Sequence, residues 1–224
     1  MKKIITVLDT NLLLGYILPN DAFHKKAVGI ASANQVYTTY SAKKECLVKI
    51  REKIAEAYLT ILKRYQDCRD YDLGDECFDP EHWGKSPEYT PIVDYLLRNH
   101  WEASHRMDLN RMIKYCNGIT NKVIISVMNS LSFIVVLQHD PDTDKRKRLL
   151  KLAYESDVEG VFYSLKDTTD RQILEEFLVD IADGISDGRK LLTGDRAFYD
   201  TAVKLQDKLD LDVFGEVSIE LVKP

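Results

Sequence analysis

Two apolar segments that each end on an aspartate most constrain how this chain of 224 residues can fold. Residues 4–8, Ile-Ile-Thr-Val-Leu, are followed by Asp9, and residues 190–193, Lys-Leu-Leu-Thr, are followed by Gly194 and Asp195. Short apolar runs of this kind are typical of buried strands in a parallel sheet. Open α/β sheets place their sites beyond the carboxyl ends of such strands. We therefore expect Asp9 and Asp195 to share one edge of the sheet.

Two further acids follow the same arrangement. Glu45 comes shortly after the β-branched and aromatic run 36–40, and Asp170 opens the apolar-patterned segment 171–182. Carboxylates brought together repel one another unless a proton or a cation neutralises them. Ligand sets made only of oxygen suit hard cations. The sequence thus predicts an Mg²⁺ or Mn²⁺ site built from Asp9, Glu45, Asp170 and Asp195.

Each of these acids also has a purely structural interpretation. An aspartate after a strand is often the N-cap of the next helix, Gly-Asp is an ordinary turn pair, and a glutamate early in a helix is favoured by the helix dipole. The N-cap alternative applies to Asp9 and Asp170, the turn alternative to Asp195, and the helix-dipole alternative to Glu45. Asp167 competes with Asp170 for the third position. Asn11 and Thr193 are candidates to orient the acids through hydrogen bonds.

Strand and helix patterns alternate at both ends of the chain. Strands are expected at 4–8, 36–40, 161–165, 190–193 and 217–222, with helices between them. This order predicts an α/β fold, with a central parallel sheet between two layers of helices. The number of residues between Glu45 and Asp170 along the chain exceeds what the connections between strands of such a sheet need. We therefore predict one domain, 1–224, with residues 66–157 as a mainly helical insertion that includes helices at 91–115, 122–138 and 145–155.

Four of these motifs together, in their order along the chain, resemble the PIN domain, a family of metal-dependent nucleases. They are the run 8–13 (Leu-Asp-Thr-Asn-Leu-Leu), Glu45, Asp170 ahead of Ile173-Leu174, and Thr193-Gly194-Asp195 with Phe198. Asp21, His24 and Ala27 also agree with a pattern that many members show. The resemblance covers roughly residues 1–55 and 158–224.

The resemblance implies a ribonuclease that hydrolyses RNA phosphodiester bonds. Asp9, Glu45, Asp170 and Asp195 would be both its catalytic residues and its ligands for Mg²⁺ or Mn²⁺, and water activated by the metal would attack the phosphate. RNA is the expected partner, and a protein antitoxin or a second copy of the chain are further candidates.

Charge gives a weaker indication of RNA binding. The formal net charge of −5 is not typical of a non-specific nucleic-acid binder. A basic run can nevertheless contact phosphates, and we list its members as candidates: Lys145, Arg146, Lys147 and Arg148.

Composition argues against a membrane protein. The longest apolar stretch, 123–137, is too short to span a bilayer and is interrupted by serine and asparagine. No signal peptide is visible at the N-terminus. The four cysteines form no CxxC pair, which argues against structural zinc. We expect reduced thiols and a cytoplasmic protein without membrane contact.

Two other functions compete with the nuclease. A phosphatase of the haloacid dehalogenase type would use Asp9 after its strand, but its chemistry requires a second acid two residues later, where this chain has Asn11. A PIN-like scaffold without catalysis would bind RNA or a protein. An intact set of four acids favours the enzyme over the scaffold.

Overall fold

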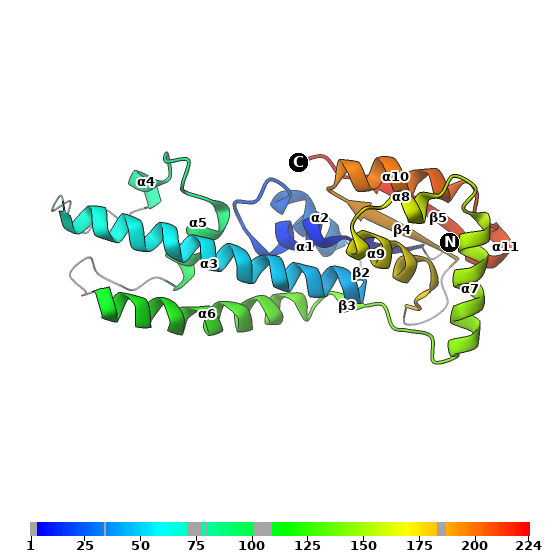
Figure 1. Ribbon diagram of the computed structural model, residues 1–224, viewed down its shortest axis with the longest axis horizontal. Coiled ribbons are helices and arrows are strands. Elements are labelled where there is room, and N and C mark those ends of the chain that lie inside the picture. The colour runs from blue at the N-terminus through cyan, green and yellow to red at the C-terminus, as the bar shows by residue number, and fades with distance from the viewer. Residues whose placement is uncertain (1–3, 34, 71–77, 79, 101–108, 183–186) are drawn as a thin grey trace. The chain divides into compact units, whose positions relative to one another are not determined.

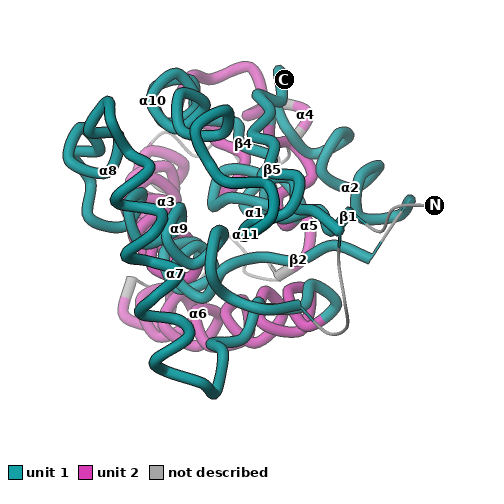
Figure 2. The backbone as a smooth tube through the Cα atoms, turned by 90° about the vertical axis from the view of Figure 1, so that its right-hand side faces the viewer, with its two compact units in different colours: residues 1–16, 22–46, 133–224 teal, residues 17–21, 47–132 magenta. Residues whose placement is uncertain are grey.

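The structure is a computed structural model that describes residues 1–224 except 1–3, 34, 71–77, 79, 101–108 and 183–186. The chain forms two compact units (Figure 2). The sheet unit comprises Met1–Tyr16, Ala22–Cys46 and Phe133–Pro224, and the helical unit comprises Ile17–Asp21 and Leu47–Ser132.

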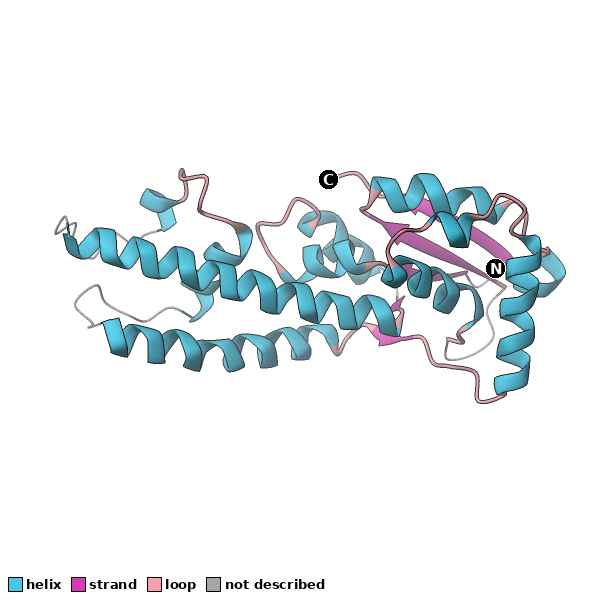
Figure 3. Cartoon of the chain, viewed as in Figure 1, coloured by secondary structure: helices cyan, strands magenta, loops and turns pink. Residues whose placement is uncertain are grey.

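The sheet unit is built on five parallel strands, which confirms the predicted parallel sheet and four of the five predicted strands. They are β1 (Ile4–Leu8), β2 (Val36–Thr38), β3 (Val135–Val136), β4 (Gly188–Thr193) and β5 (Glu216–Leu221). Their order across the sheet is β3-β2-β1-β4-β5. Figure 3 shows the strands in magenta and the helices in cyan. At the register of Leu8, the neighbours are Thr38 on β2 and Leu192 on β4.

The connections between strands explain how helices flank this sheet (Figure 1). The chain moves outward from β1 to β2 and β3, then returns to β4 beside β1 and continues to β5. Because parallel crossovers are right-handed, reversing their direction moves the connecting helices to the opposite face. The helices are α1 (Thr10–Ile17), α2 (His24–Ala33), the start of α3 (Tyr40–Asp70), α7 (Thr143–Ser156), α8 (Val161–Ser164), α9 (Thr168–Val179), α10 (Arg196–Gln206) and α11 (Leu211–Phe214).

The core of this unit lies where the central strands meet their helices. Val7, Leu8 and Leu191 are fully buried, and so are Leu174 and Phe177 of α9. Burying each such side chain contributes about 1.5–3 kcal/mol. The apolar runs that predicted the strands are therefore also what holds the sheet edge and its acids in place.

The predicted strand 161–165 is wrong, because Val161–Ser164 form helix α8. Both side-chain oxygens of Asp157 accept hydrogen bonds at the start of this helix, from the backbone N–H groups of Val161 (2.7 Å) and Phe162 (3.0 Å). This cap outweighs the modest β propensity of Val-Phe-Tyr. The third strand is instead β3, which lies within residues predicted as the helix 122–138.

The helical unit contains the remainder of α3, α4 (Pro80–Trp83), α5 (Pro91–His100) and α6 (Leu109–Leu131). The predicted insertion, 66–157, differs from this division at both ends, since the unit takes up the chain at Leu47 and α7 belongs to the sheet unit. Trp83 is buried and packs edge-on against Tyr89, with ring centroids 5.6 Å apart. These aromatic residues therefore contribute to the core of the unit.

The cysteines depart from the prediction of reduced thiols. Cys68 is disulfide-bonded, whereas Cys46 and Cys116 are buried and form no disulfide bond. The prediction is therefore wrong for Cys68. Within the described part of the chain, no helix combines the length and apolar character needed to cross a bilayer.

Candidate active site at the sheet switch point

Asp9 and Asp195 flank the point at which the sheet changes its strand order. Asp9 directly follows β1, and Asp195 stands two residues beyond the end of its neighbour β4. The chain leaves β1 toward one side of the sheet and leaves β4 toward the other. The crevice outside such a switch point is where open α/β sheets bind ligands.

Asp9 is a buried acid held by hydrogen bonds with two elements, α1 and β4. Its backbone N–H donates to the carbonyl of Leu192 (3.1 Å), which extends the ladder between β1 and β4. Oδ1 accepts from the backbone N–H of Leu12 at 3.0 Å, so Asp9 also caps α1. Oδ2 accepts a hydrogen bond of 2.5 Å from the hydroxyl of Thr193. The capping interpretation therefore holds for one oxygen, while the other faces β4.

The environment of Asp9 disfavours its charged form. Burial is the main cause, and it raises the pKa of Asp9 from 3.8 to about 6 even though hydrogen bonds from Thr193 and Leu12 lower it. The negative charge of Asp195 adds to the rise, which shows that the two acids interact. A cation between them would reverse both effects, since it attracts the charged form of each carboxylate.

Thr193 joins the two acids, in the orienting role that the sequence suggested. Its hydroxyl donates to Asp9 and accepts from the backbone N–H of Asp195 at 2.9 Å. Gly194, which lies between Thr193 and Asp195 in the sequence, has little free space around it, because a Cβ there would lie 2.8 Å from the ring of Phe23. A side chain at Gly194 would thus push against Phe23 and disturb the turn that carries Asp195.

Asp195 combines a structural role with a free oxygen. Oδ1 caps α10 by accepting from the backbone N–H of Phe198 at 2.9 Å. Oδ2 accepts no hydrogen bond from the residues that the structure describes. The second oxygen is therefore available to a ligand.

Glu45 approaches Asp9 through its neighbour in sequence. The hydroxyl of the buried Thr10 donates to Oε2 of Glu45 at 2.5 Å. Glu45 lies in the second turn of α3, which begins at the carboxyl end of β2, and is half-buried. Asn11 is half-buried on α1, and its side chain forms no hydrogen bond with the described residues.

Asp167 and Asp170, between which the sequence did not decide, occupy different positions on α9. Asp167 is the N-cap of α9 and accepts from the backbone N–H of Thr169 at 2.7 Å. Asp170 is half-buried in the first turn of the same helix. Because α9 leads to β4, its first turn lies toward the carboxyl end of the sheet, on the side of Asp9 and Asp195.

The four acids are not drawn together into one cage of ligands. Among the described residues, which include all four, no group of three or more His, Cys, Asp or Glu side chains is placed to hold a metal ion. The pair Asp9 and Asp195 is close enough to interact, and Glu45 is tied to Thr10. Mg²⁺ is commonly held by one or two carboxylates, with water and substrate phosphate filling its other positions.

The basic run on α7 does not form a single surface. Lys145 pairs with Asp140 at 2.8 Å, and Arg146 turns inward and pairs with the buried Asp180 at 2.9 Å. Lys147 lies 3.9 Å from Asp144, and Arg148 is exposed. Arg146 therefore differs from the other three in facing the interior of the sheet unit.

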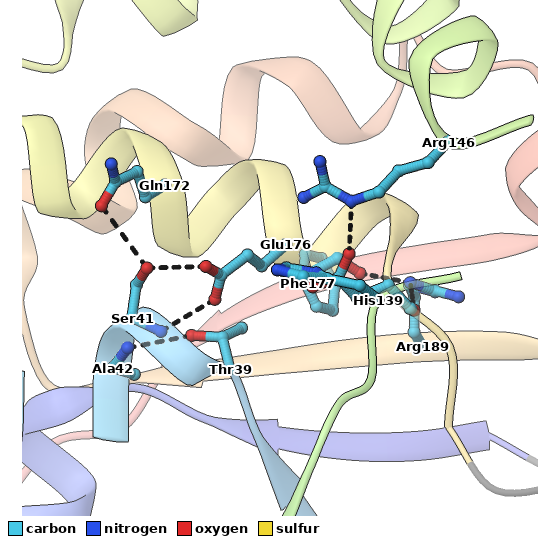
Figure 4. A network of polar contacts seen from close by, with 10 residues as sticks. Thr39, Ser41, Ala42, His139, Arg146, Gln172, Glu176, Phe177 and Arg189 are labelled. Carbon is cyan, nitrogen blue, oxygen red and sulfur yellow. Dashed lines mark hydrogen bonds and ion pairs between the residues drawn. The ribbon is translucent and has the colours of Figure 1, made fainter. Parts of the chain in front are cut away.

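Sequence analysis missed a second polar centre, which links α9 to α3 (Figure 4). The buried Glu176 accepts from the backbone N–H of Ser41 (2.9 Å) and from its hydroxyl (2.7 Å). Ser41 therefore does not act as the N-cap of α3. Instead, Thr39 accepts from the backbone N–H of Ala42 at 3.1 Å. The signal in the sequence was a glutamate on the apolar face of a helix, between Leu174 and Phe177.

Comparison with protein-family models, curated proteins and solved structures found no match to this chain. The assignment of function therefore depends on the geometry of the site and on the motifs in the sequence.

Proposed function

We propose that this protein is a divalent-metal-dependent ribonuclease of PIN type that acts at Asp9 and Asp195. The observation that carries the proposal is the pair of carboxylates at the switch point, one of them buried with its pKa raised to about 6. Buried acids with displaced pKa values concentrate at functional sites. A bound cation would offset the repulsion between these two carboxylates and so make the pair favourable.

The residues at this edge suit Mg²⁺ or Mn²⁺. Asp9 and the free Oδ2 of Asp195 would hold the ion, and Glu45 and Asp170 would contribute through bridging water. When bound, such an ion lowers the pKa of a water molecule and offsets the charge of a phosphate under attack. Thr193 keeps the Asp9 carboxylate oriented, and Thr10 does the same for Glu45.

RNA is the proposed substrate because of the four motifs that resemble the PIN family. Their acids lie in the sheet unit, at the ends of strands or in the first turns of helices, toward one edge. A dehalogenase-type phosphatase is disfavoured because Asn11 offers no acid at the position where that chemistry needs one. A protein antitoxin or a second copy of the chain would be a partner within the same proposal.

The test is cleavage of labelled single-stranded RNA by the purified protein in Mg²⁺ or Mn²⁺, with and without EDTA. We expect cleavage that EDTA stops, and a loss of at least about a hundredfold in Asp9→Asn and Asp195→Asn, because each change removes a ligand charge with little change in shape. Asp167→Asn is the matched control, since asparagine is an equally good N-cap, and it should cleave like the wild type.

Three results would overturn the proposal. They are cleavage that resists EDTA, Asn variants at positions 9 and 195 as active as the wild type, and absence of cleavage across RNAs of varied sequence that the protein measurably binds. The last result would favour the inert scaffold.

A further inference from the structure

A cavity of about 350 Å³ lies in the sheet unit beside the first turn of α3. Three helices and His139 line it, with Tyr40, Ser41 and Lys44 from α3, Arg146 from α7, and Gln172, Glu175 and Glu176 from α9. Ser41 stands four residues before Glu45 on the same helix, and residues at this spacing share one helix face. The cavity is therefore about one helical turn from the acid site.

The acidic groups of this cavity are already occupied by hydrogen-bond donors. Asp180, which is fully buried, accepts from Nε of Arg146 at 2.9 Å and contacts Nδ1 of His139 at 2.8 Å. Glu176 accepts twice from Ser41, and Oε1 of Glu175 accepts from the hydroxyl of Tyr154 at 2.5 Å. These carboxylates consequently offer little to a further ligand.

The donors of the cavity are, by contrast, largely unused. Arg146 binds Asp180 through Nε alone, and Figure 4 shows its two terminal nitrogens on the side away from this ion pair. The ammonium of Lys44 and the amide nitrogen of Gln172 form no hydrogen bond or ion pair with the described residues. Buried Asp180 thus fixes the guanidinium with its terminal N–H groups free, in the arrangement that binds phosphate oxygens.

An aromatic side chain completes the cavity. Tyr40 is 57% exposed although it lies beside these donors. Proteins bind single-stranded nucleic acids by combining cationic groups for phosphates with exposed aromatic rings on which bases stack. Cationic and amide donors next to an exposed tyrosine fit one nucleotide unit better than a free anion, which would not use the ring.

We propose that this cavity is a nucleotide subsite, in which Lys44, Arg146 and Gln172 bind one backbone phosphate of single-stranded RNA and Tyr40 stacks on the adjoining base. The inference rests on the proposed function for its ligand. It assigns to this position a nucleotide that flanks the one cleaved at Asp9 and Asp195. Its role is to hold the RNA strand and not to take part in the chemistry.

The test is binding of a fluorescent single-stranded oligouridine, measured by anisotropy in EDTA with the Asp9→Asn protein so that no cleavage occurs. We expect Lys44→Gln and Tyr40→Ala each to weaken binding about fivefold. Lys44→Gln should also reduce the slope of log affinity against log salt by about 0.7, the value for one phosphate contact on a single strand. Arg146→Lys keeps the positive charge at this position, so it should weaken RNA binding less than Lys44→Gln does.

Lys151→Gln is the matched control, because Lys151 lies on the same helix as Arg146, outside the basic run 145–148, and its side chain is 76% exposed. It should bind like the parent protein. Equal affinities for Lys44→Gln and its parent, or equal losses for Lys44→Gln and Lys151→Gln, would overturn the subsite. The subsite would also be overturned if inorganic phosphate raised the melting temperature while RNA affinity did not change in Lys44→Gln. This result would identify a site for free anions.

Failure of the two proposals can be told apart. Cleavage by the wild type with RNA affinity independent of Lys44 and Tyr40 rejects the subsite alone. RNA affinity that depends on both residues, without cleavage in any metal, rejects the nuclease alone.

Discussion

At the scale of the residue, Asp9 carries an energetic cost that its capping role does not require. The acid is buried, held by hydrogen bonds to both oxygens and placed near a second acid. A residue needed only to cap α1 would do so equally well as an asparagine, without that cost. The structure therefore shows the capping role of Asp9, and the burial of its carboxylate near Asp195 is the reason we propose a second role in binding a cation.

This cost predicts how stability depends on pH. The pKa of folded Asp9, about 6, lies above the ordinary value of 3.8, so its ionisation favours the unfolded chain. The penalty is absent below about pH 3.8 and complete above about pH 6, where two pKa units correspond to at most about 3 kcal/mol. Without metal, Asp9→Asn should therefore be more stable than the wild type at pH 7.5, and this advantage should shrink as the pH falls to 4.

Urea denaturation across this pH range measures the effect. Asp210→Asn is the control, since Asp210 is an exposed N-cap on α11 and its replacement should give no comparable change with pH. An Asp9→Asn protein that is less stable than the wild type at pH 7.5 would show that the pKa of Asp9 is not raised.

At the scale of the element, Glu176 connects the two helices that carry Glu45 and Asp170. Its carboxylate binds the first turn of α3 from the third turn of α9. The C-terminal end of α9 is itself held by Arg189 of β4, whose Nη1 donates to the carbonyls of Phe177 and Asp180. The C-terminal turn of α9 is thus bound both to α3 and to β4.

We expect Glu176→Ala to lower the free energy of unfolding by about 2 kcal/mol, because two buried donors of Ser41 lose their acceptor. Glu176→Gln retains one acceptor oxygen and should lose less. Chemical denaturation of the two variants beside the wild type gives the measurement. Equal stability of the alanine variant and the wild type would mean that water replaces the carboxylate and that the contact does not hold α3.

Elements with strong local signals were predictable, and those that depend on distant contacts were not. The strands before Asp9 and Asp195 are apolar runs bounded by turn residues, so pattern alone located them. By contrast, β3 has only two residues, and its apolar surroundings resemble a buried helix. The bond between Ser41 and Glu176 spans 135 positions, and no spacing rule connects such residues.

At the scale of the whole molecule, the sheet order brings together residues from opposite ends of the chain. Asp9 and Asp195 are far apart in sequence, and they meet because β4 inserts beside β1. Strand patterns predicted a parallel sheet and a shared edge, but they did not determine which strands are neighbours. The switch point between β1 and β4, which supports the site most strongly, became visible only in the structure.

The central claim is that a divalent cation binds between Asp9 and Asp195. Anomalous diffraction from crystals soaked in millimolar Mn²⁺ tests it most directly. We predict a peak at the carboxyl end of β1 and β4, about 2.0–2.6 Å from a carboxylate oxygen of each acid, and its absence in Asp9→Asn crystals. A peak elsewhere, or no peak in well-diffracting wild-type crystals, would contradict the proposed metal site.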